Sequence, residues 1–283
     1  MAESNKKRAE TFFKSEVEQY EDTHYGEGRR SFMSVRQEAY LRQVDSLDFG
    51  TNAVRTIEAG CGPGLMCAAL SERGHEMYAY DTSPEMLRAT GERFTSRGKL
   101  PPHLLRASIE APPFASEQFD LCVTAGVIEY LDEDRVWLEE AWRILKPGGY
   151  LVASVTNSLS PAGYLDGIVE RLKRSPTFLS GVNKVMSLRH LPPVRPRHFA
   201  VRKHRPATFE RSVEEAGFLV VAREFFHMLP WPHPFDRAMP GLTEQLGRRI
   251  EWVTRTPLAP VAEGLLVVGQ KSGPGPTPRS DGA

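Results

Sequence analysis

A turn with three glycines, entered directly after an acid, is the stretch of this sequence whose residue types and spacing could do chemistry. The segment reads Val54-Arg55-Thr56-Ile57-Glu58-Ala59-Gly60-Cys61-Gly62-Pro63-Gly64. A short apolar run precedes the turn and a helical pattern follows it, which is the layout of a strand, turn and helix in a nucleotide-binding unit. Glycines let a ligand approach the backbone, and the N–H groups at the start of the next helix face that ligand.

The spacing of Gly60, Gly62 and Gly64 narrows the choice of ligand. A dinucleotide-binding turn reads G-x-G-x-x-G, whereas this one reads G-x-G-x-G, and no G-K-[ST] follows as it would in a phosphate-binding loop. Glu58 is suited to a cationic amino group and would be out of place against a pyrophosphate. Asp81 ends the next apolar run, where an acid can bind both hydroxyls of a ribose. A ribose and a positively charged amino acid together describe S-adenosylmethionine (SAM).

The order and spacing of five sequence blocks between roughly residues 50 and 157 resemble the class I SAM-dependent methyltransferases. The blocks are Glu58–Gly64, Asp81, Pro112-Pro113-Phe114 with Phe119-Asp120-Leu121, Gly126-Val127-Ile128-Glu129-Tyr130-Leu131, and Leu145-Lys146-Pro147-Gly148-Gly149. The resemblance implies an enzyme that transfers a methyl group from SAM to a small molecule. A domain that binds another nucleotide, or a non-catalytic SAM-binding relative, is the alternative.

The resemblance and the strand ends together define an expected cofactor site. Its members are Arg36, Glu58, Gly60, Gly62, Gly64, Asp81, Thr82, Ser108, Ile109 and Ala125. Ser108 stands where the family usually has an acid that holds the adenine amino group, so a weaker contact is expected there. Ile109 is expected to pack on the adenine, and Arg36, with Tyr20 and Tyr25, is a candidate for the carboxylate end of the cofactor or the substrate mouth. Thr82 and Glu85 also fit a capping box at the start of a helix.

Alternating strand and helix patterns predict an α/β fold with a doubly wound, mostly parallel sheet. The seven strands are expected at 54–58, 76–80, 103–107, 119–124, 150–155, 218–226 and 264–270. The resemblance implies that the last strand runs antiparallel between strands five and six. The expected organisation is an N-terminal helical cap at 1–49, whose first ten residues are frayed, a SAM-binding domain at 50–271 and a disordered tail at 272–283.

The composition indicates the cellular compartment in which the protein is expected to act. The net charge is zero, and the three cysteines show no metal-ligand spacing, which favours a reducing cytoplasm and no metal site. No run approaches the roughly 20 apolar residues of a spanning helix, so no transmembrane segment is expected.

A basic lid is expected between residues 158 and 205. Residues 171–205 contain ten Lys or Arg, three His and no acid, preceded by an amphipathic stripe at Tyr164, Leu165, Ile168, Val169 and Leu172. A solvated lid explains this block, and so does contact with an anion: a small molecule, an acidic carrier protein or a membrane surface. Nucleic acid is disfavoured, because Pro192, Pro193 and Pro196 break the block and few aromatics are present for base stacking. A lipid-like or carrier-bound substrate is therefore the alternative to a free small molecule.

The catalytic residue stays unknown at this point. Many small-molecule members carry Glu-His after the fourth strand, whereas this chain has Glu129-Tyr130, so one obvious base is missing. Tyr130 and Asn157 are expected to bind substrate, and O-methylation is favoured over N- or C-methylation by its frequency in the family. The other candidate bases are His24, His198, His204, His227 and His233, each more typical of packing or surface roles.

Overall fold

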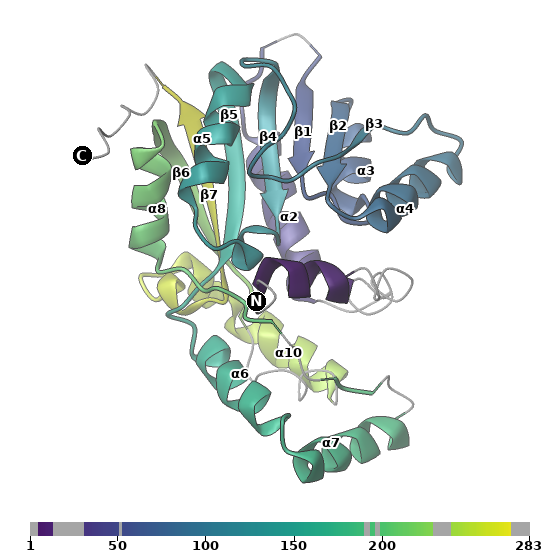
Figure 1. Ribbon diagram of the computed structural model, residues 1–283. Coiled ribbons are helices and arrows are strands. Elements are labelled where there is room, and N and C mark those ends of the chain that lie inside the picture. Colours follow the sequence, from purple (N-terminus) through teal and green to yellow (C-terminus); the bar gives the residue numbers. More distant parts are fainter. Residues whose placement is uncertain are drawn as a thin grey trace, which may run out of the picture.

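A seven-stranded sheet organises the computed structural model, which describes residues 5–13, 31–50, 53–189, 193–195, 199–228 and 239–272. The strand order is β3-β2-β1-β4-β5-β7-β6 (Figure 1). The strands are β1 Arg55–Ala59, β2 Glu76–Asp81, β3 His103–Arg106, β4 Phe119–Ala125, β5 Leu145–Thr156, β6 Phe218–Phe226 and β7 Gly264–Lys271. All seven predicted strands are present, and the predicted fold class is confirmed.

The last strand, β7, lies between β5 and β6 and runs antiparallel to both. Val152 pairs with Val268 on one side of β7, and Ala222 pairs with the same residue on the other. The pairs β1–β2, β2–β3, β1–β4 and β4–β5 are parallel. The antiparallel placement that the resemblance implied is therefore confirmed. The parallel strands end together, at the edge where open α/β sheets bind their ligands.

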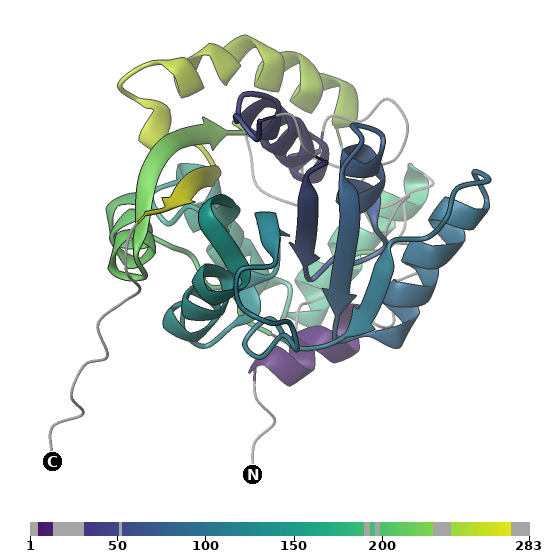
Figure 2. The ribbon, with the colours of Figure 1, turned by 90° about the horizontal axis from the view of Figure 1, so that it is seen from above.

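Helices cover both faces of the sheet (Figure 2). The helices and short 3-10 turns are α2 Phe32–Asp45, α3 Leu65–Ser71, α4 Pro84–Thr95, η1 Ile128–Tyr130, α5 Arg135–Ile144, α6 Pro161–Leu172, α7 Pro176–Leu188, α8 Pro206–Glu215, α10 Pro240–Ile250, η2 Glu251–Arg255 and η3 Ala259–Val261. Residues 5–13 are also helical. The cap of α4 is Ser83, whose Oγ accepts from Met86 N at 3.2 Å, and not Thr82 as predicted. Pro84 at the first helical position sets the start of the helix one residue later than the capping box implied.

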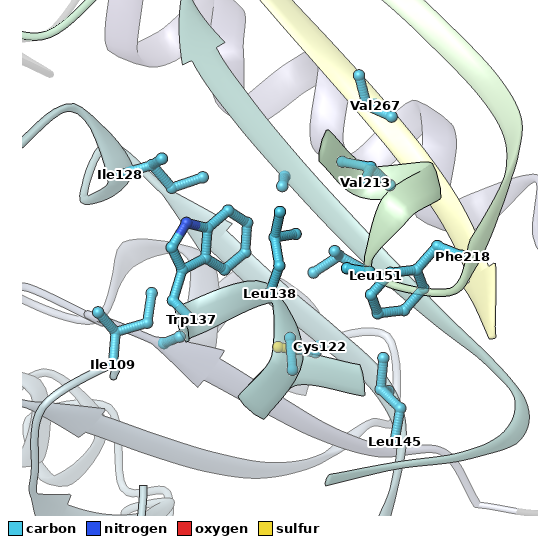
Figure 3. Packing of buried hydrophobic residues seen from close by; sticks show 14 of the residues in the cluster. Ile109, Cys122, Ile128, Trp137, Leu138, Leu145, Leu151, Val213, Phe218 and Val267 are labelled. Atoms are coloured by element: carbon cyan, nitrogen blue, oxygen red, sulfur yellow. The ribbon is translucent and has the colours of Figure 1, made fainter. Parts of the chain in front are cut away.

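Two apolar clusters, one on each face, hold the layers together. On one face Trp137 and Leu138 of α5 are buried beside Leu151 of β5 and Val213 of α8 (Figure 3). On the other face α2 and α3 cover the alternate residues of the same strands, among them Val123. The central strands are apolar on both sides, as parallel strands between two helical layers must be.

The chain leaves the sheet after β5 and returns before α8. In this insertion α6 and α7 project away from the sheet (Figure 1). Residues 199–205, which we call the return segment, lead back to the sheet edge, where Ser158 N donates to His204 O at 2.9 Å and His204 N donates to Thr156 O at 2.8 Å. Asp134 holds the same segment through Arg202 and through His204 Nε2, which lies 3.1 Å from Asp134 Oδ2. The insertion is thus tied to the main sheet at both of its ends.

Candidate functional site

The three glycines of the turn after β1 have different steric surroundings. All three have positive φ, at 71° for Gly60, 52° for Gly62 and 75° for Gly64. A Cβ on Gly60 would lie 2.3 Å from Val127 Cγ2, and one on Gly64 would lie 2.5 Å from Thr90 Cγ2. A Cβ on Gly62 would meet no described residue within 4 Å. Gly60 and Gly64 therefore allow close packing, whereas Gly62 leaves room in the cavity beside it.

A cavity lies against this turn at the carboxyl ends of β1, β2 and β4. The predicted residues that line it are Arg36, Glu58, Gly60, Gly62, Asp81, Thr82, Ser108, Ile109, Ala125 and Tyr130. Gly64 and Asn157 do not line it. One cavity thus brings together residues spread over almost a hundred positions of the sequence, as the rule for ligand sites in open α/β sheets leads us to expect.

Glu58 reaches this cavity as a buried carboxylate with an incomplete set of partners. Its side chain is only 3% exposed, and within the described part of the chain Oε2 has no hydrogen-bond partner. Burial raises the pKa of Glu58 to about 8, although a hydrogen bond from Cys67 and the charge of Arg36 act in the opposite direction. A buried carboxylate oxygen without a partner is costly, so the site favours a cationic ligand here.

Asp81 at the end of β2 fixes the turn as well as lining the cavity. Its Oδ2 accepts from Gly62 N at 3.0 Å and its Oδ1 accepts from Ser83 N at 2.9 Å. Burial raises the pKa of this carboxyl group, while these backbone N–H groups lower it. Each oxygen keeps a further lone pair, so the carboxylate can also accept from a pair of hydroxyl groups.

Residues 5–13, part of the expected N-terminal helical cap, lie at one end of the cavity. Lys6 forms an ion pair with Glu110 and donates to Ser108 Oγ at 3.1 Å, and Phe13 from the same segment also lines the cavity. The expectation that the first ten residues are frayed is therefore wrong for residues 5–10, which are helical. The signal available in the sequence was the helical spacing of Ala9, Phe12 and Phe13 beside a polar stretch.

Arg36 from α2 lies at the other end, against the backbone that follows β4. The side chain is buried, and a Cβ on Gly126 would come within 2.4 Å of Arg36 Nη1. Gly126 has φ of 79°, so this position suits glycine on two grounds. A guanidinium group in this place gives the cavity a cation at the end opposite to Ser108.

Aromatic rings and a second buried acid lie where the chain leaves β4. The Tyr130 ring is 5.1 Å from that of Phe13 and 5.5 Å from that of Phe199, measured between centroids. Glu129, next to it, is buried, and its Oε1 accepts from Thr156 Oγ1 at 3.2 Å. No described residue forms a hydrogen bond with its Oε2. Rings from three separate segments thus meet beside the cavity.

Asn157 has a structural role, and its contacts do not support the expectation that it binds substrate. The side chain is fully buried, and Nδ2 donates to Pro260 O and to Ala262 O, each at 2.7 Å. Its Oδ1 accepts from Leu159 N at 2.9 Å. Because both N–H groups are used in holding η3 beside the end of β5, none is left for a ligand.

The histidines that the structure describes give no clear general base. His204 pairs with Asp134, and His227 Nδ1 lies 2.8 Å from Glu263 Oε2; neither ring lines the cavity. His24, His198 and His233, together with Tyr20 and Tyr25, lie outside the described residues.

Comparison with known proteins agrees with this geometry. Residues 57–153 match the family model of the methyltransferase domain. An uncharacterized methyltransferase of Mycobacterium tuberculosis is 35% identical over 107 residues, which are 38% of this chain and 41% of the relative. A malonyl-[acyl-carrier protein] O-methyltransferase of Salmonella typhimurium is 32% identical over 149 residues, 53% of each chain. The chain thus matches about half, or less, of the length of these relatives.

Solved structures show the same fold at low sequence identity. A possible histamine N-methyltransferase from Thermotoga maritima superposes with a TM-score of 0.53 at 18% identity, covering 93% of this chain and 99% of the other. A putative methyltransferase from Bacillus halodurans gives a TM-score of 0.53 at 18% identity, covering 83% and 98%. The fold is therefore that of the class I methyltransferases. Within that fold, the match to the methyltransferase domain covers residues 57–153.

Proposed function

We propose that this protein transfers a methyl group from SAM to a small-molecule acceptor. The single observation that carries the proposal is Glu58, a buried acid at the cavity whose Oε2 has no hydrogen-bond partner among the residues that the structure describes. The ammonium group of SAM would supply the missing cation and hydrogen-bond donor. A pyrophosphate would place negative charge at the same position, so the site fits a dinucleotide poorly.

The other residues of the cavity fit the remaining parts of SAM. Asp81 accepts from the ribose hydroxyls, Ser108 and Ile109 contact the adenine, and Arg36 binds the carboxylate. When bound, SAM supplies a methyl group that is activated by the positive charge of its sulfonium. The protein then has to orient the acceptor and exclude water, which the rings of Phe13, Tyr130 and Phe199 do at the exit from β4.

The acceptor is proposed to bind beside Tyr130, with oxygen as the methylated atom. The frequency of O-methylation in the family supports this choice. A carrier-bound acceptor is the second candidate, because one relative is named as a malonyl-[acyl-carrier protein] O-methyltransferase and the insertion between α6 and α8 is rich in Lys and Arg. A carboxylate or amine acceptor needs no general base, which accords with the absence of a described histidine at the cavity.

Titration calorimetry with SAM and S-adenosylhomocysteine tests the cofactor assignment. We expect both to bind and NADH and ATP not to bind. Asp81→Ala should weaken SAM binding by about tenfold or more, because it removes hydrogen bonds to a charged acceptor as well as the anchor of the glycine turn. Asp45→Ala is the matched control, since Asp45 pairs with Arg73 on the surface.

Methyl-release assays against pools of small metabolites and against acylated carrier protein then test the reaction. Turnover of a free small molecule supports the proposal, and turnover of the carrier-bound pool alone supports the second candidate. Binding of SAM with no turnover in any pool would favour a non-catalytic SAM-binding protein.

A further inference from the structure

The insertion formed by α6 and α7 exposes an apolar surface that the methyltransferase site does not use. Tyr164 is 73% exposed and Leu188 is 75% exposed, values unusual for side chains of this size. The exposed apolar residues of the two helices are Tyr164, Leu165, Ile168, Leu172, Val185 and Leu188. Figure 1 shows both helices extending away from the sheet, so the packing of the sheet does not require these side chains.

The exposed residues of α6 form one continuous stripe. At 3.6 residues per turn, Tyr164, Ile168, Leu172 and Leu165 fall within an arc of about 100°. Ala162 and Val169 lie beside this arc and are buried, and they hold α6 against the rest of the protein. The helix therefore has an apolar inner edge that is packed and an apolar outer stripe that faces solvent.

The charged side chains exposed on these two helices are all basic. Arg171 of α6 and Lys184 of α7 are exposed, as are Arg174 between the two helices and Arg189 directly after α7. The two acids of the same helices, Asp166 and Glu170, are only partly exposed, and Glu170 pairs with buried Lys173 at 2.6 Å. An apolar stripe bordered by cations is complementary to a surface that combines apolar matter with negative charge.

We infer that α6 and α7 dock the protein onto an anionic lipid membrane surface, with the apolar stripe in the interface and the basic side chains at the headgroups. The occupant is a lipid surface and not an acidic protein, because exposed apolar side chains here outnumber the exposed cations. Among the described residues no helix is long and apolar enough to cross a membrane, so this contact is interfacial. The inference is independent of the proposed methyl transfer.

The return segment connects this surface with the cavity. Lys203 donates to Gly163 O at the start of α6, and Arg202 N donates to Glu129 O at 2.8 Å. Phe199 of the same segment contacts Tyr130. Docking through α6 and α7 would therefore bring the aromatic residues beside the cavity close to the membrane.

Co-sedimentation of the full chain with vesicles tests the inference. We expect binding to phosphatidylcholine vesicles that contain phosphatidylglycerol, weaker binding at high salt, and little binding to phosphatidylcholine alone. Two double variants address the two parts of the surface: Ile168→Glu with Leu172→Glu, and Arg171→Glu with Arg174→Glu. Each should lower the partition coefficient about tenfold or more, since each removes apolar contact or reverses the attraction.

Matched controls carry the same chemical changes away from the insertion. Leu100→Glu alters a side chain that is 91% exposed in the loop before β3, and Arg97→Glu with Lys99→Glu reverses two exposed charges nearby. Both controls should bind vesicles as the unaltered protein does, and circular dichroism should show that all variants fold. Absence of vesicle binding, or binding that survives in both insertion variants, would overturn the inference. Binding of a purified acidic carrier protein without any vesicle binding would overturn it as well.

Discussion

A single carboxylate links the stability of this protein to its ligand. Glu58 is buried near the end of β1, no residue in the described ranges bonds its Oε2, and burial raises its pKa to about 8. The folded protein therefore holds a proton on Glu58 over a pH range in which the unfolded chain has lost it. The contribution of Glu58 to the free energy of unfolding falls as the pH rises from about 4.5 to about 8, because there this group binds more protons in the folded state than in the unfolded state.

Replacement of Glu58 by glutamine should raise the free energy of unfolding and, at the same time, weaken SAM binding. Glu58→Gln removes the cost of ionising a buried acid, which is on the order of 5 kcal/mol at its full extent above pH 8. The free energy of unfolding of the variant should thus exceed that of the unaltered protein, by a margin that grows from pH 5 to pH 8. Urea unfolding at several pH values measures this margin.

The same variant should bind SAM at least about tenfold more weakly, because the ammonium group loses its ionic partner. Glu38→Gln on the exposed side of α2 is the control. Its free energy of unfolding and its affinity for SAM should both stay unchanged. A Glu58→Gln protein that keeps full affinity for SAM would contradict the assignment of this residue to the ammonium group.

At the scale of the structural element, the turn between β1 and α3 requires glycine for two different reasons. Gly60 lies where a Cβ would overlap Val127, whereas Gly62 borders open space in the cavity. Both have positive φ, so an alanine costs about 1–3 kcal/mol of backbone strain at either position. Only the first substitution adds a steric overlap inside the protein.

Alanine substitutions at these two glycines should therefore have different effects. Gly60→Ala should destabilise the fold by about 1–3 kcal/mol more than Gly62→Ala, because it also forces Val127 to move. Gly62→Ala should chiefly weaken SAM binding, since its methyl group enters the cavity. Thermal unfolding and calorimetry measure the two effects, and equal losses of stability in the two variants would contradict this account.

The elements that the sequence predicted are those whose signals are local. The strand at 218–226 was predicted with its observed bounds. Glu58 and Asp81 could be proposed for the site because each lies at or next to the end of a strand, which is a local signal. Lys6 was missed because its contact with Glu110 joins residues 104 positions apart, which periodicity does not report. Asn157 was misread because its position at the end of β5 suggests a ligand, whereas its partners, Pro260 O and Ala262 O, come from a distant turn. No strong signal foretold α7 or α10.

At the scale of the whole molecule, the insertion depends on a few buried polar contacts with the sheet. Asn157 joins the start of the insertion to η3, and Asp134 holds the return segment. Burial raises the pKa of Asp134, but the hydrogen bond and charge of His204, together with Arg202, outweigh it and keep the pKa below its usual value. The stability from this acid is present above the unfolded pKa near 4 and is lost as the pH falls through the lower folded value.

Asn157→Ala should destabilise the protein without affecting the cofactor. The substitution leaves two carbonyl groups without their side-chain donor, which costs about 2–4 kcal/mol in the free energy of unfolding. SAM affinity, measured by calorimetry, should stay unchanged because Asn157 does not line the cavity. Asn183→Ala is the matched control, since its bonds to Val194 stay within the insertion, and global unfolding should change less. A selective loss of SAM affinity in Asn157→Ala would contradict the structural role.

The position of β7 between β5 and β6 affects how the chain folds during its synthesis. Among the described strands, β6 pairs only with β7, and β5 has β7 as its outer neighbour. While the ribosome is still making residues 264–271, the nascent chain presents two open strand edges, which are the surfaces through which polypeptides associate wrongly. These edges stay open until β7, which is synthesised after β5 and β6, pairs with both of them. Nonsense or frameshift changes shortly before residue 264 should consequently yield insoluble product and not a weakened enzyme.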